Sequence, residues 1–135
     1  MSKIEIFSPS KMGKPLGQYS QISRVKASEF VFIAGQLATD VDGCIIGEND
    51  FEAQCRQVFR NIESALASVG THWHSVVQFT TYLVHSQDIA KFYEFRQRHF
   101  PEYFKDGIFP PNTLLIIDRL VQESFLVEVQ TIAAL

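Results

Sequence analysis

The apolar and polar positions of this chain predict two helices set among strands. The clearest segment spans residues 51–69, where apolar residues recur at spacings of three and four and form one stripe: Phe51, Cys55, Val58, Phe59, Ile62, Leu66 and Val69. Asn49, followed three positions later by Glu52, predicts a capping box at the start of this helix, and Gly70 predicts its end. The pattern therefore indicates an amphipathic helix with one buried face.

A second helix is predicted over residues 89–100, with Asp88 as its cap and one side formed by Ile89, Phe92, Tyr93, Arg96 and Phe100. Segments rich in β-branched and aromatic residues predict strands at 19–26, 29–34, 44–46 (short), 76–84, 113–120 and 125–133. The weak alternation in residues 76–84 suggests burial on both sides, in the middle of a sheet. Residues 121–124 predict an antiparallel hairpin between the last two strands.

This order of elements predicts an α+β fold, with a mixed sheet and both helices on one of its faces. The 135 residues fit a single domain, residues 1–135, and no linker or repeat divides them. The uncovered face of the sheet still carries apolar residues. We therefore expect the chain to associate with itself.

Composition and charge disfavour some classes of partner and location. The net charge is -3 and the twelve Lys and Arg residues are scattered, which disfavours a nucleic-acid partner. The sequence contains neither a secretory signal nor an apolar stretch long enough to span a membrane, so no membrane partner and a cytoplasmic location are expected. The two cysteines, Cys44 and Cys55, are expected to be reduced in that compartment.

Glu128 is the most informative candidate for chemistry, because its neighbours are apolar. Alternation places it with Leu126 on the face opposite Val127 and Val129. A carboxylate there is solvated, paired, or part of a site. Pro110 and Pro111 restrict the backbone before the preceding strand, so residues 112–113 are expected at a rigid rim where a pocket begins.

A metal site at His72-Trp73-His74 is disfavoured, because the sequence offers no third ligand at a suitable spacing. We expect instead a loop that is anchored by its tryptophan. The chain has no glycine-rich phosphate loop, nucleophile elbow or Cys-His signature. No metal and no organic cofactor are therefore expected.

Several segments, taken together and in order, resemble the RidA (YjgF) family over nearly the whole chain. They are Gly17-Gln18-Tyr19-Ser20-Gln21, Phe32-Ile33-Ala34-Gly35-Gln36-Leu37, Gln54 with Asn61-Ile62, Val76 to Leu83, Phe109-Pro110-Pro111, and Leu126-Val127-Glu128-Val129 with Ile132-Ala133. The resemblance implies a two-layer, chorismate-mutase-like α+β fold that assembles as a homotrimer. It also implies small-molecule clefts at the subunit interfaces. The implied activity is hydrolysis of reactive enamines and imines to 2-keto acids and ammonia without metal or organic cofactor.

By motif position, the resemblance implies that Tyr19 closes the cleft and Glu128 orients the attacking water. The position of the family arginine that grips the substrate carboxylate is occupied by Asn112, and Leu114 stands where relatives often have cysteine. The other candidate ligand-binding residues are Gly35, Gln36, Tyr93 and Thr113.

The loss of the arginine bears on function, because a buried charge-assisted contact is worth about 2 to 5 kcal/mol. Arg119 points to the other face of its predicted strand, whereas Arg96 can substitute only if the trimer brings it to the cleft. Two functions remain open: a deaminase with altered substrate choice, which the retained Tyr19 and Glu128 favour, or a noncatalytic trimer that binds a metabolite or partner. Relatives are also described as ribonucleases, a function that the acidic balance disfavours.

Overall fold

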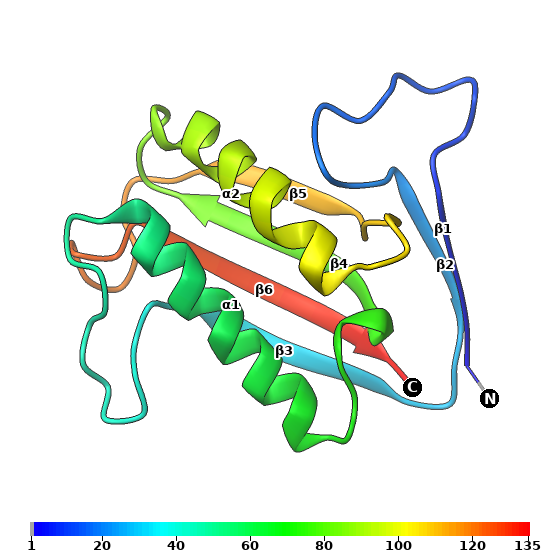
Figure 1. Ribbon diagram of the computed structural model, residues 1–135, viewed down its shortest axis with the longest axis horizontal. Helices are drawn as coiled ribbons and strands as arrows, with labels where there is room; N and C mark the ends of the chain where they lie inside the picture. Colours follow the sequence, from blue (N-terminus) through cyan, green and yellow to red (C-terminus); the bar gives the residue numbers. More distant parts are fainter. Residues whose placement is uncertain (1) are drawn as a thin grey trace.

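A computed structural model describes residues 2–135 and shows two helices covering one face of a four-stranded sheet (Figure 1). The elements are β1 (Lys3–Phe7), β2 (Ile22–Lys26), β3 (Phe30–Gln36), α1 (Phe51–Ser68), a short 3-10 turn (Trp73–Ser75), β4 (Val76–Leu83), α2 (Asp88–Tyr103), β5 (Asn112–Ile116) and β6 (Val127–Ala134). The predicted α+β class, with both helices on one side of a mixed sheet, is confirmed. No helix within residues 2–135 is both long and apolar enough to cross a membrane.

The main sheet has the strand order β3-β6-β4-β5. Strand β6 runs antiparallel to both of its neighbours, whereas β4 and β5 are parallel and are joined through α2. The predicted hairpin between the last two strands is therefore wrong. Val127 and Val129 are fully buried, which suits the centre of the sheet, while β5 lies exposed at its edge. The segment between these strands is long enough to carry the chain across β4.

Two smaller predictions are also corrected, and one pair of strands adds an element that was not predicted. Residues 44–46 form no strand, only a single bridge between Thr39 and Ile45. Helix α1 is capped by Asp50, whose side chain accepts a hydrogen bond from the backbone N–H of Ala53 at 3.0 Å. The expected cap, Asn49, instead has a left-handed backbone with φ 60°. The sequence did not reveal β1, which pairs with β2 as a separate two-stranded sheet beside the main one (Figure 1).

The core lies between the helices and the sheet and is dominated by aromatic side chains. The ring of Phe59 on α1 stacks with Phe95 at 5.4 Å and meets the edge of Phe100 at 5.5 Å, so the two helices are held together by phenylalanines. Gln54, also on α1, is fully buried. Its amide donates to the carbonyls of Gly47 and Ser124 and accepts from the N–H of Leu126, which fixes the start of β6.

The face of the sheet opposite the helices is only partly covered and carries large apolar residues. Phe32 is 74% exposed and pairs with Ile132 on β6. Because Val127, Val129, Thr131 and Ala133 are buried under the helices, Glu128 lies with Ile132 on this outer face, as the alternation predicted. An apolar surface of this kind normally marks an interaction site.

Candidate functional site

Glu128 lies directly over Gly35, on the outer face of the sheet. Strand β6 places Glu128 beside Tyr82 of β4 on one side, and its carboxylate reaches over β3 on the other. A Cβ atom added to residue 35 would stand 1.9 Å from the Oε2 atom of Glu128 and 2.8 Å from its Cγ atom. Only glycine gives the carboxylate room there.

The environment of Glu128 is chemically suited to a base. Its side chain is half-buried, and desolvation raises the pKa of the carboxyl group above its usual value of 4.5. Beside it, β3 departs from regular pairing between Ile33 and Gln36, and the Gln36 side-chain amide donates to the carbonyl of Ala34 at 3.0 Å. Of these two residues, Gly35 lies against Glu128, whereas Gln36 pairs with Val129 on β6.

Tyr19 and Tyr93 come together around the guanidinium of Arg96. Arg96 lies on α2 and is only 1% exposed. Its guanidinium carbon lies 5.0 Å from the ring centre of Tyr93, 5.8 Å from that of Tyr19 and 4.7 Å from that of Phe92. The hydroxyl of Tyr19 accepts a hydrogen bond from the N–H of Leu16 at 3.1 Å. The loop that precedes β2 is thereby packed against the helix.

Strand β5 places its three candidate residues on alternate sides of the sheet. Asn112 and Leu114 pair with Phe79 and Thr81, which are buried under the helices, whereas Thr113 pairs with Thr80 on the outer face. The side-chain carbonyl of Asn112 accepts a hydrogen bond from the hydroxyl of Thr81 at 2.7 Å. The amide of Asn112 is therefore already engaged within the protomer.

Within one protomer the predicted residues do not converge on a single hollow. Glu128 belongs to the outer face, while Asn112 and Tyr19 lie on the side of the helices. Arg96 is the residue whose importance the sequence understated. The sequence did indicate that Arg96 is buried, because this residue occupies the apolar stripe of α2 between Phe92 and Phe100.

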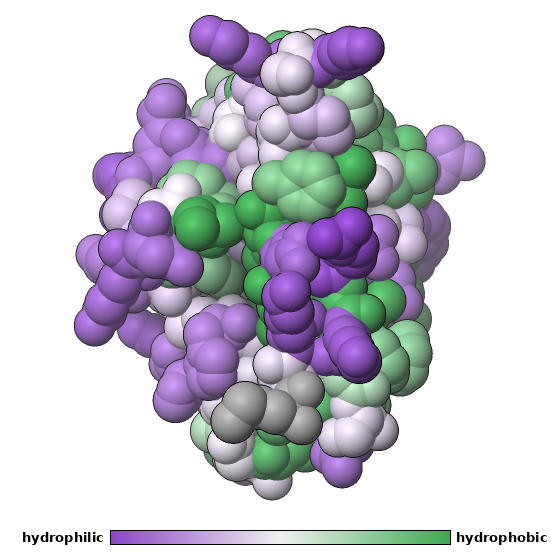
Figure 2. All heavy atoms as spheres, turned by 90° about the vertical axis from the view of Figure 1, so that its right-hand side faces the viewer, coloured by the Kyte–Doolittle hydropathy of each residue, from purple (hydrophilic) through white to green (hydrophobic). Residues whose placement is uncertain are grey.

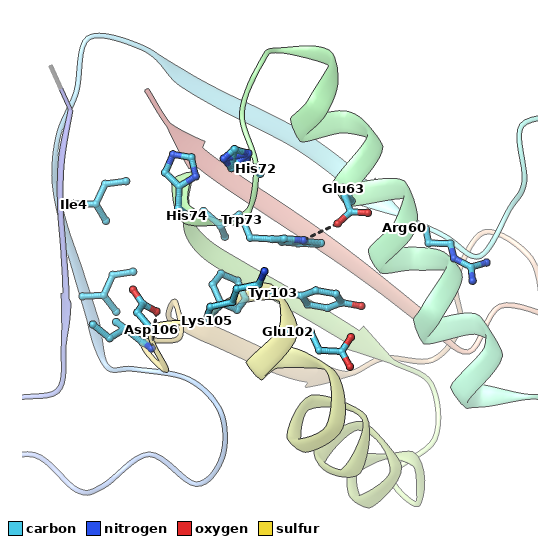
Figure 3. A pocket seen from close by; sticks show the side chains of 14 residues that line it. Ile4, Arg60, Glu63, His72, Trp73, His74, Glu102, Tyr103, Lys105 and Asp106 are labelled. Atoms are coloured by element: carbon cyan, nitrogen blue, oxygen red, sulfur yellow. Dashed lines mark hydrogen bonds between the residues drawn. The ribbon is translucent and has the colours of Figure 1, made fainter.

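A separate cavity of about 910 Å³ lies between β1 and the C-terminal end of α2 (Figure 3). Its wall includes Trp73, which stacks on Tyr103 at 4.5 Å and donates from its indole nitrogen to Glu63 at 3.0 Å. Burial raises the pKa of Tyr103 to about 12. His72 and His74 border the same cavity, and residues 2–135 contain no group of three or more His, Cys, Asp or Glu placed to hold a metal ion.

The side of the molecule that carries the β1–β2 hairpin has strongly hydrophilic residues near its middle, flanked by hydrophobic surface (Figure 2). On the hairpin itself, Glu5 forms ion pairs with Lys3 at 3.1 Å and with Arg24 at 2.7 Å, and these contacts lower the pKa of the glutamate. The carboxylate of Glu5 therefore offsets only part of the positive charge of Lys3 and Arg24.

Comparison with known proteins identifies the family. The sequence profile described as Endoribonuclease L-PSP matches residues 10–135. A RutC family protein of Pyrococcus horikoshii is 34% identical over 129 residues, which cover 96% of each chain. The chain belongs to the RidA (YjgF) family. Reactive Intermediate Deaminase A of Arabidopsis thaliana is 31% identical over 99 residues, or 73% of this chain and 52% of that protein.

Solved structures agree with this family at the level of the fold. The Rid family protein YyfB from Yersinia pestis, of unknown function, has a TM-score of 0.86 at 23% identity and covers 98% of both chains. The RidA-family architecture also appears in Escherichia coli TdcF, solved with bound serine, with a TM-score of 0.70 at 21% identity over 96% of this chain and 98% of that one. At these identities the likeness concerns the fold alone.

Proposed function

We propose that this RidA-family protein hydrolyses small reactive imines or enamines without a cofactor, as a homotrimer. The observation that carries the proposal is the carboxylate of Glu128, which lies over Gly35 in a partly dry position that raises its pKa. A carboxylate with a raised pKa is a stronger base towards water. The similarity to the Arabidopsis deaminase supports the same chemistry.

In the proposed reaction Glu128 accepts a proton from a water molecule while the water oxygen bonds to the imine carbon. The π electrons of the C=N bond move to nitrogen, which takes up a proton from solvent to give a neutral carbinolamine. Glu128 then returns its proton to the amine, the C–N bond breaks, and the oxygen loses its proton to solvent as the carbonyl forms. The sum is imine plus water giving ketone plus ammonia, with the carboxylate regenerated.

Self-association would complete the site. Phe32 is 74% exposed on the same face as Glu128, so packing that face against another copy would bury apolar surface and dry the carboxylate further. A second copy can also bring residues from the helix side of its own sheet towards Glu128. Contacts between copies would explain why the candidate site residues lie on two different faces of the sheet within one protomer.

The test is ammonia release from imines generated in situ from several amino acids. The wild type is compared with Glu128→Ala, Asn112→Arg and the matched control Glu123→Ala, whose carboxylate lies on the exposed loop before β6. We expect Glu128→Ala to lose about 100-fold or more of the activity, which is the usual range for a general base, and Glu123→Ala to retain it. If the wild type matches buffer on every imine while Asn112→Arg gains activity, this proposal fails for that class of substrate.

A second candidate function is noncatalytic binding of a small metabolite in the same clefts. The hydrogen bond that Thr81 donates to Asn112 favours it, because the amide at the position of the family arginine is a neutral group with its carbonyl already occupied. A thermal-shift screen with keto acids, amino acids and neutral analogues tests this alternative, since a bound ligand raises the melting temperature. Shifts without any ammonia release would select it over the enzyme.

A further inference from the structure

The guanidinium of Arg96 is buried without an anionic partner among the described residues. Its Nε and Nη1 atoms make no hydrogen bond. The rings of Phe92, Tyr93 and Tyr19 surround it, and no carboxylate within residues 2–135 forms an ion pair with it. A charged side chain is rarely left in this state unless a ligand or another chain completes it.

The aromatic rings compensate only part of the cost of burying this charge. They attract the cation through their faces, but the rings do not accept the hydrogen bonds that its Nε and Nη1 atoms lack. Burial lowers the pKa of the Arg96 guanidinium, with weaker opposing effects from Tyr93 and Tyr19. An arriving anion would satisfy both the charge and the orphaned donors.

The cover over Arg96 is a loop that is held together by its own hydrogen bonds. Within residues 8–21, Gln21 donates to Gly13 and to Ser8, and Leu16 donates to Tyr19. The loop meets the guanidinium through Gly17, where an added Cβ atom would stand 3.1 Å from the Nη2 atom of Arg96. Because residue 17 has no side chain, the backbone of the loop can approach the guanidinium closely at this point.

We propose that Arg96 recognises the carboxylate of the substrate or product, beneath the loop of residues 8–21. A single guanidinium balances a monoanion, and its planar donors match a carboxylate in a two-pronged contact. Arg96 lies on the same side of the sheet as Asn112, and it supplies the charge that the amide of Asn112 lacks. This inference rests on the proposed function for the identity of the ligand as a 2-keto acid or its imine.

The test measures binding of pyruvate, the simplest 2-keto acid, and of its uncharged methyl ester by calorimetry. The variants are Arg96→Met, which keeps an unbranched apolar stem and removes the charge, and the control Arg98→Met, whose side chain is 55% exposed and lies two residues further along the helix. We expect Arg96→Met to weaken pyruvate binding about 30-fold or more, since charge-assisted contacts are usually worth that much. Binding of the ester, and both affinities of Arg98→Met, should match the wild type.

A measurement on the wild type covers the case in which Arg96→Met does not fold. The Nε–H resonance of Arg96 is assigned in the NMR spectrum by its absence from that of Arg96→Lys, and it should shift on titration with pyruvate and stay in place with the ester. An unmoved resonance, no pyruvate binding by the wild type, or equal affinities in Arg96→Met and wild type would each overturn the inference. Loss of the oligomer in Arg96→Met without loss of pyruvate binding would also overturn it, because a second copy would then supply the anion.

These outcomes are separable from failure of the proposed function. Binding is measured without turnover, so pyruvate affinity that depends on Arg96 supports the inference even if the wild type releases no ammonia. Conversely, imine hydrolysis with the same KM in wild type and Arg96→Met would retain the enzyme and reject Arg96 as its carboxylate-binding residue.

Discussion

Adding one methyl group at Gly35 should disable the site through Glu128. In Gly35→Ala the new Cβ atom would stand 1.9 Å from Oε2, 2.6 Å from Cδ and 2.8 Å from Cγ of the glutamate, whereas ordinary contacts begin near 3.4 Å. The carboxylate must therefore move by about 1.5 Å, and because Cγ also clashes, rotation of the carboxylate group alone is insufficient.

The expected effects differ for activity and for stability. A displacement of this size costs about 100-fold in the rate of a reaction that depends on a positioned base. Overpacking costs about 1 to 3 kcal/mol of unfolding free energy. The second effect should vanish in a Glu128→Ala background, where the space over residue 35 is open, so the two substitutions should couple by about 1 to 3 kcal/mol.

The assay is a double-mutant cycle in urea denaturation, accompanied by the ammonia-release measurement. Gly13→Ala is the matched control, because an added Cβ atom there meets nothing within 4 Å and its backbone is not left-handed. Additive free energies, or full activity in Gly35→Ala, would show that the glutamate does not lie over Gly35 in solution and would refute the reasoning.

Three further results are expected. Activity should fall as the pH drops through a value above 4.5, where Glu128 becomes protonated. Glu128→Gln should match the wild type in unfolding free energy at pH 4 and exceed it at pH 7. The reason is that a carboxyl group whose pKa is raised in the folded state destabilises that state when it ionises. Gln54→Leu should lower the unfolding free energy measured by urea denaturation by about 2 to 4 kcal/mol, since it leaves three partly buried backbone groups unpaired, while the exposed control Gln97→Leu should not. Phe32→Asp should yield monomers in analytical ultracentrifugation, whereas the fully exposed control Val41→Asp should associate as the wild type does.

Local patterns in the sequence were reliable where the physics is local. The stripe from Phe51 to Leu66 predicted α1 because residues three and four apart share one face whatever the rest of the chain does. Alternation likewise placed Glu128 on the face opposite Val127 and Val129, and the structure agrees. The exact cap was missed, because Asn49 and Asp50 are both good capping residues and the left-handed turn at Asn49 selects the second.

Strand pairing was mispredicted because it depends on distant partners. Residues close in sequence favoured a hairpin between the last two strands, but β6 buries more apolar surface between β3 and β4 than it would at an edge. Gln54 reinforces that choice by binding Ser124 and Leu126 just before β6. No short-range signal records such a contact.

The sequence by itself determined the helices, the two faces of β6 and the family, because these follow from periodicity and from ordered motifs along the chain. Only the tertiary structure decided that β6 lies at the centre of the sheet, that Glu128 rests on Gly35, and that Arg96 is enclosed by aromatic rings without an anion. The physical reason is that each of these depends on which distant segments share buried space. That choice is made by the packing free energy of the whole domain, whereas the preferences of neighbouring residues act only along the chain.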